Sequence, residues 1–177
     1  MRNVIAIGSI VFVLLTGCKA LDKLTQFILE YRTTYEYPSN LPPFETDSLQ
    51  TPEIVTNADR EFAINNTHKN LIESVLLRQL RITIKTPPEQ QFSFLRAVQI
   101  YISAEGLPSR LVAYKYDIGN DAGQVLDLNL VDIDLKDYVK KDKINLHVTS
   151  YTDELVRSNT SVEVYARFFV DAKILGI

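Results

Sequence analysis

The chain has 177 residues, a formal net charge of −3, one cysteine and no tryptophan. That length is enough for one domain with a sizeable core. The net negative charge argues against nucleic acid as a partner and against electrostatic binding to anionic lipid. The lone cysteine excludes a disulfide within the chain, and the absence of tryptophan lowers the weight of a carbohydrate-binding surface built on tryptophan platforms.

The N-terminus has the three-part layout of a secretory signal. Arg2 is followed by an apolar run over residues 4–15, and two small residues precede Cys18. The run is too short to span a membrane, which takes ~20 apolar residues. Leu15-Thr16-Gly17-Cys18 resembles the lipobox of bacterial lipoproteins, whose pattern is a leucine, two small residues and a cysteine.

The lipobox resemblance implies a lipid anchor on Cys18. The family chemistry links that thiol to diacylglycerol, makes the cysteine the new N-terminus and usually acylates its amine. Each buried CH₂ contributes ~0.8 kcal/mol, so two or three acyl chains anchor durably. An ordinary signal peptide with an incidental cysteine is the alternative. Lys19 differs from the aspartate that can retain lipoproteins in an inner membrane, which favours the outer membrane of a cell envelope.

These features predict three segments: a signal peptide over residues 1–17, a lipidated tether over 18–23 and a single domain over 24–177. The signal carries one basic and no acidic residue. Its removal leaves 160 residues with 18 basic and 22 acidic side chains.

Strict alternation of apolar and polar residues over 26–37 predicts a long strand with one buried face. Proline-rich residues 38–52 predict an extended connection from one sheet to the other, because proline donates no ladder hydrogen bond. Shorter or similar patterns predict further strands over residues 53–56, 61–65, 75–86, 92–104, 110–118, 125–131, 144–151 and 161–174.

Two short helices and one hairpin loop are predicted between these strands. Asn66 or Thr67 can cap a helix over residues 68–74. Asp132 and Asp134 can cap another over 135–140. Residues 119–123 are typical of a hairpin loop. About eight or nine strands, one or two short helices and brief connections predict an all-β fold, an antiparallel β-sandwich of the immunoglobulin-like kind.

No catalytic constellation is evident in the sequence. His68 and His147 are the only histidines, and no Gly-x-Ser-x-Gly turn occurs. We interpret both histidines as surface or half-buried residues. Glu30 and Glu36 share a strand face but lie ~20 Å apart, too far for an acid/base pair. We therefore expect no enzymatic activity.

Metal sites are also not expected. Calcium takes six to eight converging oxygens. In residues 117–123, Gly119 stands where a ligand belongs, and no bidentate glutamate follows. Asp132 and Asp134 fit better as helix-capping residues. We expect no metal and no cofactor.

The tyrosines suggest a weak contact surface. Tyr101 and Tyr165 fall opposite the apolar faces of their strands, so they are candidate binding residues for a protein or a glycan. The alternative is cross-strand aromatic pairing that only stabilises a sheet. Asp47-Ser48-Leu49 resembles an O-glycosylation acceptor used on exported proteins of some bacteria, and it lies in the proline-rich connection.

The leading functional hypothesis is a non-catalytic, membrane-anchored lipoprotein domain that binds or scaffolds other envelope proteins. The alternative is a ligand-binding lipoprotein that grips glycan or lipid between the sheets or at the loop end. A continuous apolar pocket would favour the alternative.

The lipid assignment yields a direct test. Cells that express the full chain should incorporate labelled palmitate into it, and Cys18→Ala should abolish the label because no other thiol is present. Autoradiography of the immunoprecipitated protein measures this. Labelling that persists in Cys18→Ala would contradict the anchor.

Overall fold

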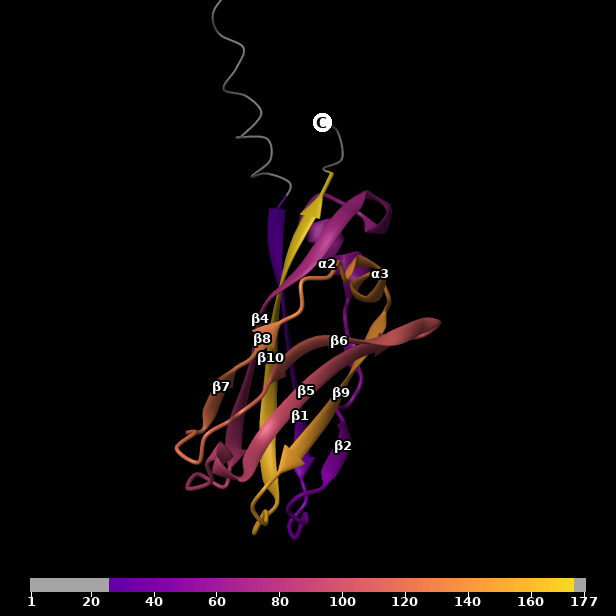
Figure 1. The fold of residues 1–177 in the computed structure, drawn as a ribbon. Helices are drawn as coiled ribbons and strands as arrows, with labels where there is room; N and C mark the ends of the chain where they lie inside the picture. Colours follow the sequence, from indigo (N-terminus) through magenta and orange to yellow (C-terminus); the bar gives the residue numbers. More distant parts are fainter. Residues whose placement is uncertain (1–25, 174–177) are drawn as a thin grey trace, which may run out of the picture.

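The computed structural model describes residues 26–173, which form two antiparallel sheets. Sheet one contains, in spatial order, β1 (Gln26–Tyr37), β10 (Thr160–Ala172), β4 (Ile72–Thr86) and β7 (Val125–Asp127). Sheet two contains β2 (Thr46–Gln50), β9 (Lys143–Thr152), β5 (Leu95–Ala104), β6 (Leu107–Lys115) and β8 (Asn129–Leu130), and β3 (Ile54–Val55) also pairs with β9. In the view of Figure 1, β5 and β9 cross in front of β1 and β10.

Short helical segments connect the strands. They are α2 (Ala58–Ile64), α3 (Lys136–Val139) and two single-turn 3₁₀ helices, η1 (Lys69–Leu71) and η2 (Phe92–Phe94). Figure 1 shows α2 and α3 at the same end of the sandwich, the end at which β1 begins.

The strand order is that of a jelly roll. β1 pairs with β10, β2 with β9, β4 with β7 and β5 with β6. Apart from the β5–β6 hairpin, consecutive strands of this set lie in opposite sheets. Sheets ordered β1-β10-β4-β7 and β2-β9-β5-β6 are the double-sheet arrangement of jelly rolls. The prediction of an all-β antiparallel sandwich is confirmed. Its strand order departs from the immunoglobulin-like one, in which the first strand pairs with the second.

Alternating apolar residues fill the space between the sheets, as the strand patterns predicted. In β10 the inward set is at most 3 % exposed, and it comprises Val162, Val164, Ala166, Phe168, Val170 and Ala172. In β5, Val98, Ile100 and Ile102 are at most 1 % exposed. These strands lie at the centres of their sheets, so each inward side chain is covered by the opposite sheet.

One inward position of β4 differs from expectation. The pattern of residues 75–86 predicted Leu76 on the buried face, but Leu77 is buried and Leu76 is only half-buried. A β-bulge causes the change: Gln79 pairs with Arg167, whereas Leu77 pairs with Phe168, so Arg78 is an extra residue. An extra residue reverses the side-chain parity on one side of it.

Several local predictions were wrong or incomplete. Residues 61–65 lie mostly in α2 and not in a strand, because Ala58 and Phe62, one helical turn apart, are the buried pair. Only Lys69–Leu71 of the helix expected over 68–74 is helical. The connection over 38–52 does cross between the sheets, and it also contains β2.

The expected hairpin at residues 119–123 is wrong, because β6 and β7 belong to different sheets. The strand expected over 125–131 is likewise divided: β7 pairs with β4 in sheet one, and β8 pairs with β6 in sheet two. The helix expected over 135–140 is present as α3. As predicted, Asp134 helps to cap it, because its Oδ1 accepts a hydrogen bond from the backbone N–H of Lys136 at 3.0 Å.

Two tyrosines form a buried polar cluster at the end of β1. Tyr35 is 4 % exposed and Tyr37 is fully buried. The Tyr37 hydroxyl is 2.6 Å from Ser150 Oγ, and the Tyr35 hydroxyl donates to Tyr37 at 3.3 Å. Burial raises the pKa of Tyr37 to about 12, an increase that the hydrogen bonds to Ser150 and Tyr35 moderate. Burial also raises the pKa of Tyr35 well above its usual value, and the neighbouring Tyr37 adds to this.

The buried phenols predict a loss of stability at high pH. A phenol whose pKa is higher in the folded than in the unfolded chain stabilises the fold while it stays protonated. That contribution is complete below the unfolded pKa and is lost as the pH rises through the folded pKa. For Tyr37 this window runs from 10.0 to about 12. We expect Tyr37 to contribute a fall of ~2–3 kcal/mol in the free energy of unfolding over this range, and Tyr35 to add to it, as measured by urea titrations followed by circular dichroism.

Matched variants identify the groups responsible. Tyr37→Phe should lower stability at neutral pH by ~1 kcal/mol through the lost hydrogen bond. It should also reduce the alkaline decrease without abolishing it, because Tyr35 remains. Tyr151→Phe, at a position that is 38 % exposed, should leave the decrease unchanged. A wild-type stability that stays constant up to pH 12 would contradict the assignment.

Candidate functional site

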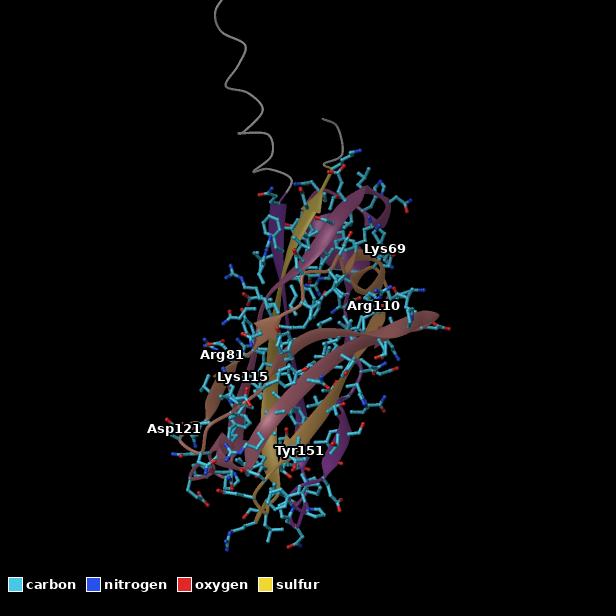
Figure 2. The ribbon with its side chains drawn as sticks, in the orientation of Figure 1. Lys69, Arg81, Arg110, Lys115, Asp121 and Tyr151 are labelled. Atoms are coloured by element: carbon cyan, nitrogen blue, oxygen red, sulfur yellow. The ribbon has the colours of Figure 1, made fainter. Side chains whose placement is uncertain are left out.

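The outer face of sheet one is charged and rich in ion pairs. These join Arg32 to Glu163 (3.1 Å), Arg81 to Asp127 (2.8 Å) and Arg167 to Glu30 (3.8 Å). Figure 2 shows Arg81 and Lys115 together on the β7 side, where both contact Asp127. Exposed pairs of this kind contribute little to stability and are typical of a solvated surface.

The outer face of sheet two has a different composition. Its side chains alternate with the buried residues of β2, β9, β5 and β6, and Tyr116 continues the face after β6. We call this set the uncharged face; it comprises Thr46, Ser48, Gln50, Ala97, Gln99, Tyr101, Ser103, Leu111, Tyr114, Tyr116, Asn145, His147, Thr149 and Tyr151. The set contains no aspartate, glutamate, lysine or arginine. On β9 it begins at Asn145, because the preceding outward residue is Lys143, which pairs with Glu53. Tyr151, labelled in Figure 2, marks the β9 end of this face.

Contacts between neighbouring strands order the middle of the uncharged face. Ser48 Oγ on β2 lies 2.7 Å from Nε2 of His147 on β9. His147 stands opposite Tyr101 of β5, and their rings meet edge to face with centroids 6.3 Å apart. Three adjacent strands are therefore joined by side chains as well as by their backbone ladders.

The same network continues to β6. Tyr101 donates its hydroxyl hydrogen to Gln99 Oε1 at 3.2 Å, and Gln99 Nε2 donates to the Tyr116 hydroxyl at 2.7 Å. The rings of Tyr116 and Tyr114 lie 5.0 Å apart. Because these side chains restrict one another, the middle of the face is ordered before any partner binds.

The Ser48–His147 pair resembles two members of a hydrolase triad. A working triad also needs a group that orients the histidine and donors that stabilise an oxyanion. Within residues 26–173, no carboxylate hydrogen-bonds His147, whose Nε2 pairs with the Ser48 hydroxyl. Ser48 also lies in the edge strand β2 on an exposed face. The geometry favours a structural hydrogen bond over nucleophilic catalysis.

A cleft of about 870 Å³ adjoins the uncharged face at Ser103 and Asn145. The rest of its lining is mostly charged: Glu53, Glu105, Asp142, Lys69, Lys140, Lys141 and Lys143. Several of these ions already have partners, since Lys69 pairs with Asp142 at 2.9 Å and Lys143 with Glu53 at 2.6 Å. This polar cleft is unlike the apolar groove that a lipid ligand requires.

The two candidate tyrosines lie on opposite sides of the molecule. Tyr101 belongs to the uncharged face, whereas Tyr165 lies on the outer face of sheet one. There Tyr165 donates its hydroxyl hydrogen to Glu30 at 2.8 Å, and the Arg32 guanidinium lies 4.4 Å from its ring centroid. The hydrogen bond to Glu30 raises the pKa of Tyr165. The structure therefore does not bring Tyr101 and Tyr165 into one surface.

Three aspartates of residues 127–142 are engaged in separate contacts. Asp127 pairs with Arg81, Asp142 with Lys69, and Asp134 accepts from two backbone N–H groups. The hydrogen bond from Arg81 lowers the pKa of Asp127. In the part of the chain that the structure describes, no group of three or more histidine, cysteine, aspartate or glutamate side chains could hold a metal ion.

Of the two predicted modification motifs, the structure describes the glycosylation acceptor, which lies in β2, but not the lipobox. In Asp47-Ser48-Leu49, Ser48 is exposed, whereas Asp47 points inward and its Oδ2 is buried without a hydrogen-bond partner. Cys18 and the tether lie outside the described residues. Among residues 26–173, no helix is long and apolar enough to cross a membrane.

Comparisons with known proteins identify no family. No protein-family model matches the chain, and no curated protein matches it. Among solved structures, turnip yellow mosaic virus matches at 11% identity and a TM-score of 0.29, with 99% of this chain and 93% of that chain covered. An empty turnip yellow mosaic virus particle matches at 8% identity and a TM-score of 0.28, covering 98% and 92%. Desmodium yellow mottle tymovirus matches at 10% and 0.26, covering 100% and 94%. At these TM-scores the likenesses carry no argument about this chain.

The Ser48–His147 geometry can be tested with a fluorophosphonate probe, which labels activated serines. We expect no labelling of Ser48, because no carboxylate among the described residues orients His147. Mass spectrometry of the probe-treated protein checks this. Labelling of the wild type that is lost in both Ser48→Ala and His147→Gln would contradict a purely structural role for this hydrogen bond and indicate a hydrolase.

Proposed function

We propose that this protein is a non-catalytic, lipid-anchored envelope protein that binds another protein through the uncharged face. The observation that carries the proposal is the contrast between the two outer faces. Sheet one carries exposed ion pairs, whereas the uncharged face carries tyrosine, amide and hydroxyl side chains and no formal charge.

The chemistry of the uncharged face suits a protein partner. The centres of protein interfaces are depleted in charged residues and enriched in aromatic ones. Tyrosine supplies a large, rigid contact area, and serine and asparagine supply adaptable hydrogen bonds. Burying such a surface avoids the desolvation cost of ions. The contacts that join Ser48, His147, Tyr101 and Gln99 further reduce the entropy lost on binding.

The envelope location rests on the N-terminal sequence. The lipobox resemblance at Cys18 supports a lipid anchor, and Lys19 favours the outer membrane. The tether over residues 18–23 is short, so the domain would remain close to its membrane. A membrane-bound domain that presents one uncharged face is suited to hold or position a neighbouring envelope protein.

A glycan is the second candidate ligand. Amide and hydroxyl groups beside the neighbouring rings of Tyr114 and Tyr116 can donate to and accept from sugar hydroxyls. A lipid ligand has less support, because the cleft beside the face is polar and charged.

A charge placed on the uncharged face should prevent binding. Thr149 of β9 points outward on this face, and Thr83 of β4 points outward on sheet one; both are half-buried. We expect Thr149→Lys to weaken partner capture at least ~10-fold, because an unpaired lysine would be desolvated in the interface. Thr83→Lys is the matched control and should leave capture unchanged. Quantitative affinity capture from native envelopes compares both with the wild type.

The same captures distinguish the two ligand classes. A protein that is retained by the wild type and by Thr83→Lys, but lost with Thr149→Lys, would support the proposal. Recovery of glycan without any specific protein would favour the second candidate. Equal capture by all three chains would exclude the uncharged face as the binding site.

A further inference from the structure

The four sheet edges of the sandwich differ greatly in length. Sheet one ends at β7, with 3 residues, and at β1, with 12 residues. Sheet two ends at β8, with 2 residues, and at β2 and β3, with 5 and 2 residues. Natural proteins keep edge strands short because a long edge offers a row of unpaired backbone groups to another strand. β1 is the exception here.

The edge of β1 carries charged side chains but lacks several of the other common protections. Its register with β10 runs without a bulge from Gln26 to Tyr37, and the strand contains no proline and no lysine. Among the described residues, no loop or second strand makes a backbone hydrogen bond to β1 besides β10. The backbone groups that point away from β10 are therefore available along a regular strand of 12 residues.

The outward charges of β1 are self-complementary. We infer that β1 pairs antiparallel with β1 of a second copy, in the register that places Tyr31 opposite itself. In that register Glu30 lies opposite Arg32 of the second copy, and Arg32 lies opposite Glu30 of the second copy. Two ion pairs form across the two-fold axis. Ile28, which is 38 % exposed, lies opposite Thr34.

The neighbouring registers are unfavourable because they expose inward side chains or place like charges opposite one another. A shift of one residue would place inward side chains on the solvent side of the joined sheet. A shift of two residues in one direction places Glu30 opposite Glu30, and in the other direction it places Arg32 opposite Arg32. Like charges directly opposite one another destabilise a strand pair. Only the register centred on Tyr31 matches both charges while nearly all of β1 is paired.

The side chains are already placed for this contact. Glu30 and Arg32 are 51% and 59% exposed at their side chains. Each is also held by its own sheet, since Glu30 accepts from Tyr165 and Arg32 contacts Glu163 at 3.1 Å. On the inward side, Phe27 and Tyr31 pack against the core but remain half-exposed at the edge, so a second strand would cover them.

This dimer goes beyond the proposed function and does not depend on it. The pairing uses the edge of sheet one, whereas the uncharged face lies on sheet two. Both copies therefore keep that face free. A dimer would present two such faces, and two linked sites increase the overall avidity for a multivalent partner.

Charge-swapped chains test the register. Full-length protein is purified in detergent, and its mass is measured by sedimentation across a concentration series. The wild type should dimerise. Arg32→Glu, which brings acidic side chains opposite one another, should weaken the dimer at least ~10-fold, and so should Glu30→Arg. A mixture of the two variants should form a dimer with one copy of each, because both opposed pairs are then of opposite charge.

Arg81→Glu is the matched control, because it also breaks one exposed ion pair on sheet one but lies away from the β1 edge. It should dimerise like the wild type. Should either β1 charge variant fail to fold, Ile28→Lys and its control Val125→Lys, on the opposite edge of the same sheet, replace them. A monomeric wild type at every concentration, a dimer that Arg32→Glu does not weaken, or single variants that do not associate when mixed would each overturn the inference.

Discussion

The position of β10 between β1 and β4 is the constraint on which sheet one depends. The last strand that the structure describes must pair with the first, across more than a hundred residues of sequence, before that sheet exists. β9 has the same role in sheet two, where it lies between β2 and β5. Such non-local pairing costs loop-closure entropy that the buried core must offset. The alternating apolar residues of β10 and β5, nearly all fully buried, provide that core.

The position of β9 also creates the uncharged face. Ser48 and Tyr101 are far apart in the sequence, and they come together because β2 and β5 both pair with the strand that carries His147. The backbone ladders thus determine which side chains are neighbours, and the alternation along each strand determines which of them point outward. The outward residues that differ in charge between the two faces occur at every second position of their strands. They form continuous surfaces only when the strands pair.

This explains which parts of the fold could be predicted. The strand over residues 26–37 and the inward set of β10 followed from period-two alternation, which depends on local sequence alone. The jelly-roll order did not, because alternation does not reveal which strands pair. The loop over 119–123 has residues typical of a hairpin, yet the chain crosses there to the other sheet. The bulge at Arg78 likewise depends on the partner strand, so Leu76 was placed on the wrong face.

The candidate site shows the same division between local and non-local information. Tyr101 and His147 were predicted to point away from the core because of their strand positions, and both do. Ser48 was missed because its segment was interpreted as a connection and not as β2. A usable signal was nevertheless present: residues 97–103 and 145–151 have no charged residue at their outward positions, whereas residues 26–37 and 161–171 alternate charges with apolar residues. Outward positions that avoid charge on two strands, when half of the outward positions of β1 and β10 are charged, are a stronger indication of a contact surface than any single exposed tyrosine.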